Sequence, residues 1–272
     1  MFNKLRKKLL SRLVRSSKFD RSKSFTSEEG TKFIHEARNA QQSLRLFTPL
    51  NDPNLKYISL GQNCSSAWYL KQVGLKNESY PFDWIFSSPE IVFDCIKNNF
   101  SILLEKSQIK SNNEGESAGH LIYHSNLFHH RSPLKSEDDY QYYVRCCNRF
   151  SCQVNSDNSI VFLMILINEP DKRPDWANGF TKKFKMPRKQ SLSDIEKIIS
   201  YLKHKNRRAK FLIVDHYTNQ EKSVMHEIID DSTFFIKFCS GGSSTGVCYS
   251  DKLDDFCFKL VISGLCNNPS VW

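Results

Sequence analysis

The sequence predicts an α/β protein: a mostly parallel sheet with helices on both faces, forming a three-layer sandwich, preceded by a basic helical N-terminal extension. From Leu55 onward, short runs rich in β-branched and aromatic residues alternate with longer stretches of helical spacing. The run 160–167 is apolar on both faces, which is typical of a central strand covered on either side. Strands separated by helices imply crossover connections and therefore parallel pairing.

The expected elements follow one another along the chain. Runs with the composition of strands are 56–60, 121–127, 160–167, 210–214 and 233–238. Helical spacing occurs over 31–46, 65–73, 89–104, 138–153, 192–203, 220–229 and 252–263. Between them, residues 168–189 are rich in Pro, Lys and Arg and form an irregular excursion. Both a lid and a plain surface loop are open interpretations of this excursion.

The chain divides near residue 50 into an N-terminal extension, 1–50, and an α/β domain, 51–272, which can bury one sizeable core. No run of about 18 apolar residues occurs, so we expect no membrane-spanning helix. Residues 1–30 hold nine Lys or Arg and three Asp or Glu, so most of the formal net charge of +10 lies in this tail. The rest of the chain is nearly balanced in charge.

The first residues of the tail have an amphipathic pattern. Phe2, Leu5, Leu9 and Leu13 recur at helical spacing among basic residues, which predicts a short basic helix. Charges interrupt the apolar stretch that a signal peptide needs, so we expect a cytoplasmic protein. Two interpretations of residues 1–15 stay open: peripheral contact with an anionic membrane such as the inner membrane, or a solvated terminus.

The nine cysteines are odd in number and scattered, which does not indicate a disulfide framework. Most lie in apolar patterns, as Cys257 does between two phenylalanines, and there we expect them to pack as small hydrophobic side chains. Cys146, Cys147 and Cys152 lack Cys-x-x-Cys spacing and a matched pair of histidines. We therefore expect no metal site and no cofactor.

Residues capable of chemistry follow several of the expected strands. In an open parallel sheet, ligands bind beyond the carboxyl ends of the strands. Cys64 follows the first strand, His129 and His130 follow the second, and Asp215 and His216 follow the fourth. We therefore expect a nucleophile, imidazoles and a carboxylate to converge at this edge.

Cys64 is the candidate nucleophile. It lies at the first turn of the helix expected near Ser65, where exposed amides and the helix dipole favour the nucleophilic thiolate. The preceding Gln62 and Asn63 are candidates to stabilise a developing oxyanion or to bind substrate. The alternative interpretation is that Cys64 is one more buried thiol.

A cysteine nucleophile also needs a base. His129 is our first choice, with His216 and His130 next, and Asp215 would orient the imidazole. His130 and His216 are also candidates to contact substrate. The alternatives are that His129 is an exposed loop histidine and that Asp215 caps the following helix or turn.

The segment 79–84 reads Ser-Tyr-Pro-Phe-Asp-Trp and is unusual in composition. The proline fixes an extended turn, the aromatic residues anchor it, and Asp83 needs hydrogen-bonded partners if it is buried. We expect Asp83 and Trp84 either to shape the wall of a substrate pocket or to belong to a packed loop.

These residues carry a resemblance to a known family. Residues 59–67 read Ser-Leu-Gly-Gln-Asn-Cys-Ser-Ser-Ala and are followed by Leu-Lys-Gln-Val-Gly-Leu at 70–75 and by the segment 79–84. This order resembles the opening signature of a bacterial family of unknown function named as putative papain-like cysteine peptidases. The resemblance runs from about Tyr57 to Ile167, which is under half of the chain.

The family's second block is a His-containing strand end followed by a helix with an Arg-x-x-Arg-Phe-like pattern. Here 128–130 and 143–150 approximate it. In the family the histidine is usually followed by an acidic residue, and His130 stands in that place here. The β/α alternation fits a doubly wound sheet better than the two lobes of papain, so the family name would describe the active-site chemistry.

The resemblance implies a cysteine hydrolase that acts on a peptide, acyl or glycan-linked substrate through an acyl-enzyme at Cys64. Two alternatives stay open. An acyl-enzyme intercepted by a sugar hydroxyl would give an acyltransferase that modifies surface polysaccharide. The chain could also be a non-enzymatic binding module. Nucleic acid is not an expected partner, because a nucleic-acid surface normally carries its charge on the folded body.

Overall fold

The structure, a computed structural model, describes residues 25, 27–112, 117–168, 177–187 and 189–267. Its main sheet has five strands in the order β1-β4-β5-β7-β6. These are β1 (Lys56–Ser59), β4 (Ile160–Ile167), β5 (Ala209–Tyr217), β7 (Thr233–Cys239) and β6 (Ser223–Ile228). The first four are mutually parallel, and β6 pairs antiparallel with β7. The predicted fold class is confirmed.

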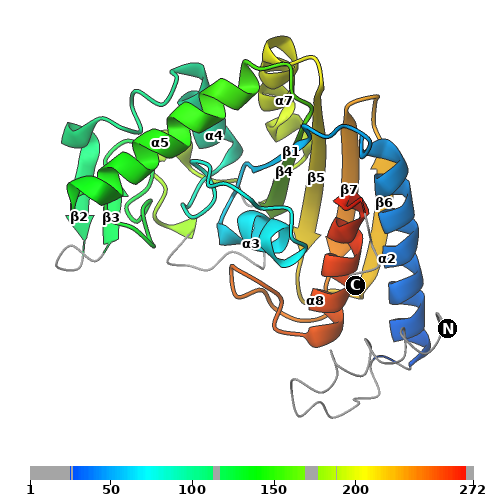
Figure 1. Cartoon of the computed structure of the whole chain (residues 1–272). Helices are drawn as coiled ribbons and strands as arrows, with labels where there is room; N and C mark the ends of the chain where they lie inside the picture. Colours follow the sequence, from blue (N-terminus) through cyan, green and yellow to red (C-terminus); the bar gives the residue numbers. More distant parts are fainter. Residues whose placement is uncertain (1–24, 26, 113–116, 169–176, 188, 268–272) are drawn as a thin grey trace.

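Helices cover both faces of this sheet (Figure 1). On one face lie α2 (Glu28–Phe47), α3 (Cys64–Gln72) and α8 (Lys252–Ile262). Here α2 packs on α8, β6 and β7, while α3 packs on β1 and β4. On the other face lie α4 (Pro89–Lys97), α5 (Glu137–Val154) and α7 (Glu196–Lys205). There α7 contacts β5 and α4, and a phenylalanine ring of α5 contacts one of β4.

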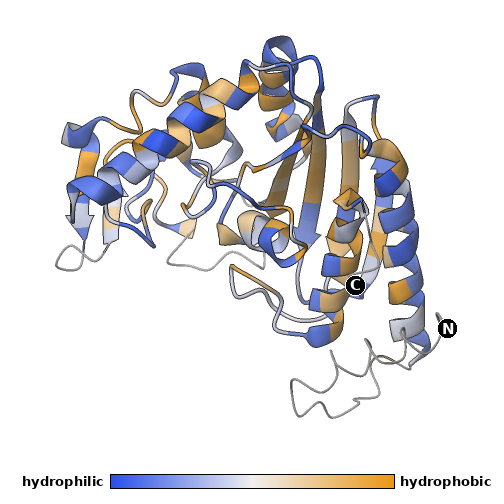
Figure 2. Cartoon of the chain, viewed as in Figure 1, coloured by the Kyte–Doolittle hydropathy of each residue, from blue (hydrophilic) through white to orange (hydrophobic). Residues whose placement is uncertain are grey.

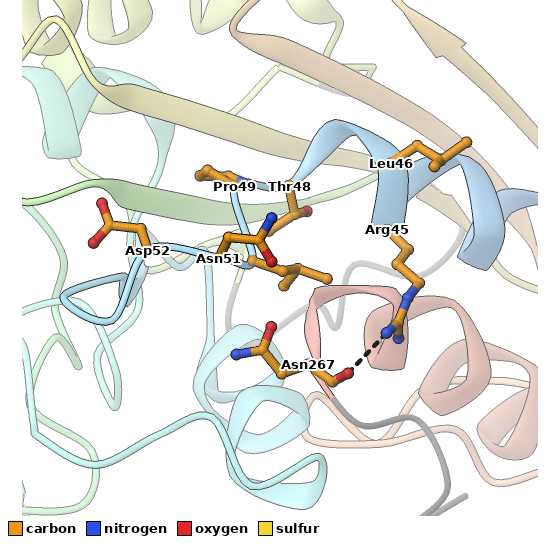
Figure 3. A pocket seen from close by; sticks show the side chains of 8 residues that line it. Arg45, Leu46, Thr48, Pro49, Asn51, Asp52 and Asn267 are labelled. Atoms are coloured by element: carbon orange, nitrogen blue, oxygen red, sulfur yellow. Dashed lines mark hydrogen bonds between the residues drawn. The ribbon is translucent and has the colours of Figure 1, made fainter.

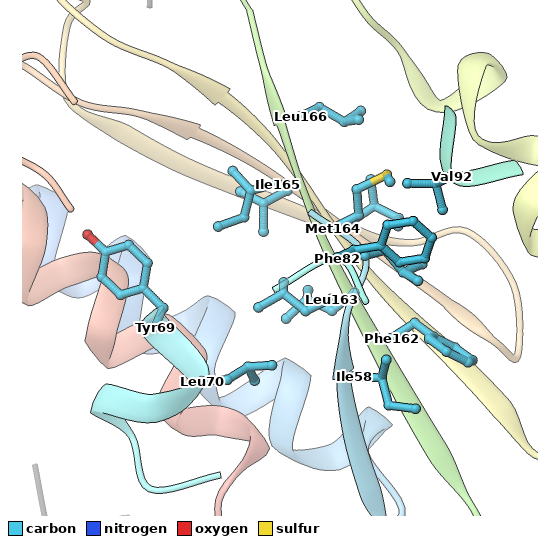
Figure 4. Packing of buried hydrophobic residues seen from close by; sticks show 14 of the residues in the cluster. Ile58, Tyr69, Leu70, Phe82, Val92, Phe162, Leu163, Met164, Ile165 and Leu166 are labelled. Carbon is cyan, nitrogen blue, oxygen red and sulfur yellow. The ribbon is translucent and has the colours of Figure 1, made fainter. Parts of the chain in front are cut away.

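The core is organised around β4, whose residues 160–167 are all buried. Figure 4 shows Leu163 pointing toward Leu70 of α3, and Met164 toward Val92 of α4. Figure 2 shows the same arrangement as hydrophobic strands between helices of mixed polarity. The sequence prediction of a central strand with two apolar faces is therefore confirmed, because successive side chains point to opposite layers.

The expected strand at 121–127 is wrong. Instead, β2 (Ile109–Asn112) and β3 (Ser117–His120) form a separate antiparallel pair, and 121–127 is a series of turns. The apolar pattern of this segment comes from anchoring on the neighbouring excursion. The buried ring of His124 packs on Phe180 with centroids 4.5 Å apart. The backbones of these two residues also form an isolated antiparallel β-bridge.

The expected helix at 220–229 is also wrong, because these residues contain the edge strand β6. Pairing with β7 uses one side of the strand, and on the other side the N–H of Val224 donates to Glu36 of α2 at 2.9 Å. Tertiary pairing thus overrides local helical spacing. The expected helix at 89–104 is shorter than predicted, since α4 ends at Lys97 and the chain turns with positive φ at Asn99 and Phe100.

Helix α2 belongs to the packed body, although its residues fall within the expected extension. Phe33, Ala37, Ala40 and Leu44 are fully buried along one side of it. The first 24 residues, including the basic helix expected at 1–15, lie outside the described residues. None of the described helices is long and apolar enough to cross a membrane.

All nine cysteines are free thiols. Cys152 is exposed and Cys248 is half-buried, whereas the others are buried. Within the described ranges, no group of three His, Cys, Asp or Glu side chains is arranged to hold a metal ion.

Two leucines of α2 test whether this helix is part of the folded core. Leu44 is fully buried and Leu46 is 88% exposed. Leu44→Ala should lower the free energy of unfolding by about 2–5 kcal/mol, because it leaves a cavity beside Gly264, in the turn that follows α8. Leu46→Ala should change it by less than about 0.5 kcal/mol. Urea unfolding followed by circular dichroism measures both, and equal effects would show that α2 does not pack as described.

Candidate active site

The turn between β1 and α3 is fixed by its neighbours. Gly61 has a φ of +92°, which favours glycine, and a Cβ there would collide with Oγ of Ser87. The N–H of Ile165 donates to the Gly61 carbonyl at 3.1 Å, and the N–H of Ser87 donates to the Gln62 carbonyl at 2.7 Å. Hydrogen bonds from β4 and from Ser87 therefore both fix the backbone that leads to Cys64.

Cys64 is the first residue of α3. Asn63 caps the helix, because its Oδ1 accepts hydrogen bonds from the N–H of Ser65 at 3.0 Å and from the Ser65 hydroxyl at 2.6 Å. The Cys64 side chain is 6% exposed. The structure thus places the sulfur at the positive end of a helix, at the carboxyl edge of the sheet.

His130 is the imidazole that meets this sulfur. Its Nε2 lies 3.0 Å from Sγ of Cys64. The histidine follows Phe128, whose N–H donates to the Ala118 carbonyl of β3 at 2.8 Å, so the small β2–β3 pair supports it. The indole of Trp84 meets the imidazole edge-on, with centroids 6.1 Å apart. We call Cys64 and His130 the Cys–His pair.

Burial favours the neutral form of both partners. It raises the pKa of the Cys64 thiol to about 12, and the negative charge of Asp83 adds to this rise. Burial also lowers the pKa of His130, and the nearby His129 lowers it further. A desolvated site disfavours the charged form of each group. The resting pair is therefore a thiol and a neutral imidazole.

This result corrects the expected thiolate. The helix start does supply exposed amides beside Cys64, but the loss of water around the sulfur outweighs them. Deprotonation of the sulfur therefore requires a proton acceptor, and the nearest imidazole nitrogen is 3.0 Å away.

His129, our first choice as base, lies beside His130, with ring centroids 5.0 Å apart, but among the described residues it makes no contact with the Cys64 sulfur. Its ring packs on Phe86 with centroids 5.6 Å apart, and its Nδ1 lies 3.1 Å from the side-chain nitrogen of Asn126. The geometry therefore assigns the position beside Cys64 to His130. The two histidines are adjacent in sequence and in the same loop, so sequence alone could not distinguish them.

Asp215 and His216 do not join the Cys–His pair. Asp215 accepts a hydrogen bond from the Asn168 amide and interacts with the Tyr217 hydroxyl, and burial raises its pKa. The His216 ring packs on Tyr249, and full burial lowers its pKa to about 3. Both residues lie at the end of β5, which is separated from β1 by β4. The expected orienting contact from Asp215 is therefore absent from the contacts of the described residues.

Gln62 is fully buried and its side chain is occupied. Its Oε1 accepts from the N–H of Ile167 at 2.8 Å, and its amide pairs with the amide of Gln190. Gln62 therefore does not offer a hydrogen-bond donor to an oxyanion, contrary to our expectation from the sequence. Asn63 differs, because its Oδ1 is the helix cap while its Nδ2 has no hydrogen-bond partner among the described residues.

Asp83 lies inside a packed loop. It is 1% exposed, pairs with Lys76, and its Oδ2 accepts from the N–H of Tyr80 at 2.7 Å. Burial raises its pKa to about 6. The segment 79–84 thus behaves as the packed-loop interpretation predicted, while Trp84 at its end contacts His130.

Comparison with known proteins identifies the family of this chain. The family described as "Putative papain-like cysteine peptidase (DUF1796)" matches residues 55–238, which is more than half of the chain. The chain belongs to this family. The match includes both members of the Cys–His pair.

One relative of this papain-like family member is an uncharacterized protein of Acanthamoeba polyphaga mimivirus. It is 46% identical over 56 residues, which are 20% of this chain and 25% of the relative. The chain thus spans about a quarter of that protein. The relative is viral, whereas the resemblance pointed to a bacterial family. No solved structure matches the chain.

A hollow of about 570 Å³ lies away from Cys64 (Figure 3). It is lined by the turn after α2, including Thr48 and Asp52, and by Asn267. Leu55 and Lys56 then lead into the amino end of β1, and Asp52 pairs with Arg208 just before β5. The hollow is therefore at the amino ends of the strands, opposite the Cys–His pair.

Sequence reasoning missed Gln190 and Ser87. Ser87 lies between two expected elements, and Gln190 directly follows the basic excursion 168–189, so neither had a periodic pattern or a charged partner that could be read from sequence. Asn168 was visible only as a polar residue after the central strand. Their roles come from contacts between segments that are far apart in the chain.

The buried thiol makes a direct prediction about reactivity. With its pKa near 12, the rate at which iodoacetamide alkylates Cys64 should keep rising about tenfold per pH unit up to pH 9.5, because so little thiolate is present. Peptide-resolved mass spectrometry would follow Cys64 and the exposed Cys152 in the same sample. A plateau in the Cys64 rate between pH 5 and 8 would indicate a preformed thiolate–imidazolium pair and contradict the neutral pair.

Proposed function

We propose that the protein is a cysteine hydrolase that cleaves an amide or ester bond of a peptide substrate through an acyl-enzyme on Cys64, with His130 as general base. The observation that carries this proposal is the 3.0 Å distance between Sγ of Cys64 and Nε2 of His130 at the start of α3. A nucleophile within hydrogen-bond reach of a base is the arrangement that covalent catalysis needs. Membership of a papain-like peptidase family supports the peptide as substrate class.

In the first half of the reaction, Sγ attacks the substrate carbonyl carbon while the thiol proton moves to Nε2 of His130. The tetrahedral intermediate then collapses, and the leaving amine or alcohol departs with that proton. The products of this half are a thioester on Cys64, a neutral imidazole and the free leaving group. A neutral His130 suits this step, since only the unprotonated imidazole can accept the proton.

In the second half, water replaces the leaving group. His130 accepts a proton from water as its oxygen attacks the thioester carbon, and the proton then returns to the departing sulfur. The substrate acid is released and the thiol is restored. An alcohol that enters in place of water would give acyl transfer by the same steps.

The oxyanion of each intermediate needs donors near the sulfur. The N–H of Cys64 is in the first turn of α3, where backbone donors have no partner within the helix. The Nδ2 of Asn63 is the second donor, because capping engages only the oxygen of this side chain. Each such donor contributes about 10²–10³ in rate in enzymes of known mechanism.

Two neighbouring histidines provide a matched test of the base. With p-nitrophenyl acetate as acyl donor, Cys64 should become acetylated, and His130→Ala should slow this by about 10²–10⁴-fold because the proton acceptor is lost. His129→Ala should slow it by less than about tenfold, since its ring packs on Phe86 and His130 but does not contact the sulfur. Intact-mass and peptide mass spectrometry measure the adduct, and Cys64→Ser is the blank.

The proposal is overturned if wild-type Cys64 acquires no acyl group, or if His130→Ala is acylated at the wild-type rate. The fate of the adduct then distinguishes two activities. Release in buffer alone supports a hydrolase, whereas release only after a sugar or another hydroxyl acceptor is added supports an acyltransferase and contradicts the hydrolase.

A further inference from the structure

A buried chain of amide side chains runs from the active-site turn to β5. Gln62, two residues before Cys64, pairs with Gln190: the Nε2 of Gln190 donates to Oε1 of Gln62 at 3.1 Å, and the Nε2 of Gln62 donates back to Gln190. The N–H of Gln190 donates to Oδ1 of Asn168 at 2.5 Å, and the Asn168 amide donates to Asp215. Gln62 and Gln190 are fully buried and Asn168 is 1% exposed.

The two glutamines also hold the peptide at the end of β4. The N–H of Ile167 donates to Oε1 of Gln62 at 2.8 Å, and the Ile167 carbonyl accepts from Nε2 of Gln190 at 2.9 Å. The backbone carbonyl of Gln62 accepts from the N–H and the hydroxyl of Ser87. Gln62 is therefore fixed at both its side chain and its backbone. A fully satisfied buried network of this kind favours a single geometry.

We propose that Gln190 is a positioning residue for Cys64, acting through the reciprocal amide pair with Gln62. The inference rests on the proposed function, because the property that it explains is the acylation of Cys64. Gln190 touches neither the sulfur nor the imidazole in the structure. Its effect passes through Gln62, which is two residues from the nucleophile and part of the same tight turn.

The need for an amide at this position follows from the donors and acceptors. Gln190 must both accept from Gln62 and donate to Gln62 and to the Ile167 carbonyl. A carboxylate can only accept, so it would face two oxygen atoms without a proton between them. A protonated carboxylic acid can accept from Gln62 and donate one hydrogen bond back, which restores the reciprocal pair.

Gln190→Glu therefore makes the pairing depend on pH. Burial raises the pKa of a glutamate above its usual value of about 4.3. The charged groups connected to this position are Asp215, reached through Asn168, and Lys189, which precedes residue 190 in the chain. Lys189 and Lys237 both act electrostatically on Asp215. Below its pKa the variant has the proton that the pair needs, and above it this proton is lost.

The test is the ratio of the Cys64 acylation rate of Gln190→Glu to that of the wild type, measured with p-nitrophenyl acetate from pH 5 to 8.5. We expect a ratio within about threefold of unity at pH 5 and a loss of about 100-fold at pH 8.5, the size of effect that a displacement of about 1 Å produces. The ratio cancels the pH dependence of the Cys–His pair itself. The melting temperature at each pH verifies that the variant is folded during the assay.

Gln220→Glu is the matched control, since Gln220 is exposed and its substitution should leave the ratio near unity at every pH. Gln62→Glu is the second variant, because a protonated acid there can form the same reciprocal pair from the other side. It should show the same recovery at low pH, which keeps the inference testable if Gln190→Glu does not fold.

The outcomes separate the two claims. If the wild type and Gln220→Glu are acylated but the folded Gln190→Glu or Gln62→Glu variant shows a constant ratio over the pH range, the positioning role is wrong and the proposed function stands. A ratio that falls with pH supports the positioning role. If the wild type is not acylated at all, the proposed function fails and the inference falls with it.

Discussion

The contact between the Cys64 sulfur and the His130 imidazole depends on two segments that meet from different parts of the fold. The sulfur is placed by the turn after β1, which glycine, Ser87 and β4 hold in one conformation. The imidazole is placed by a loop attached to the small β2–β3 pair outside the main sheet. The 3.0 Å separation therefore requires that the main sheet and this small sheet keep their relative position.

The sequence predicted the parts of the fold that follow from local pattern. A strand such as 160–167 is visible because it is apolar throughout, and α5 is visible because its buried residues recur at helical spacing. Strand β6 was missed because its pairing with β7 and its contact with Glu36 are invisible to local spacing. For the same reason, the apolar residues of 121–127 suggested a strand where the chain forms turns.

The residues of the site likewise fall into those that the sequence predicted and those that only the structure identified. The rule that ligands bind beyond strand ends located Cys64 and brought histidines into consideration. The choice between His129 and His130 needed coordinates, since the two are adjacent in one loop and only the contact with the Cys64 sulfur distinguishes them. The protonation state of the pair also needed coordinates, because the helix start lowers the pKa of the thiol whereas the loss of water raises it. The amide pair that ends at Gln190 joins residues 128 positions apart, which no local pattern reveals.

The central claim is that Cys64 and His130 form a hydrogen-bonded neutral pair, and the ring nitrogens of His130 report on it directly. In protein labelled with ¹⁵N-histidine, long-range ¹H–¹⁵N spectra distinguish a neutral imidazole from an imidazolium. At pH 7 the account predicts a neutral His130 that titrates below its usual value, because burial lowers its pKa, with resonances that change more in Cys64→Ala than those of His129 do. A His130 that is protonated at pH 7, or that is unaffected by loss of the Cys64 sulfur, would contradict it.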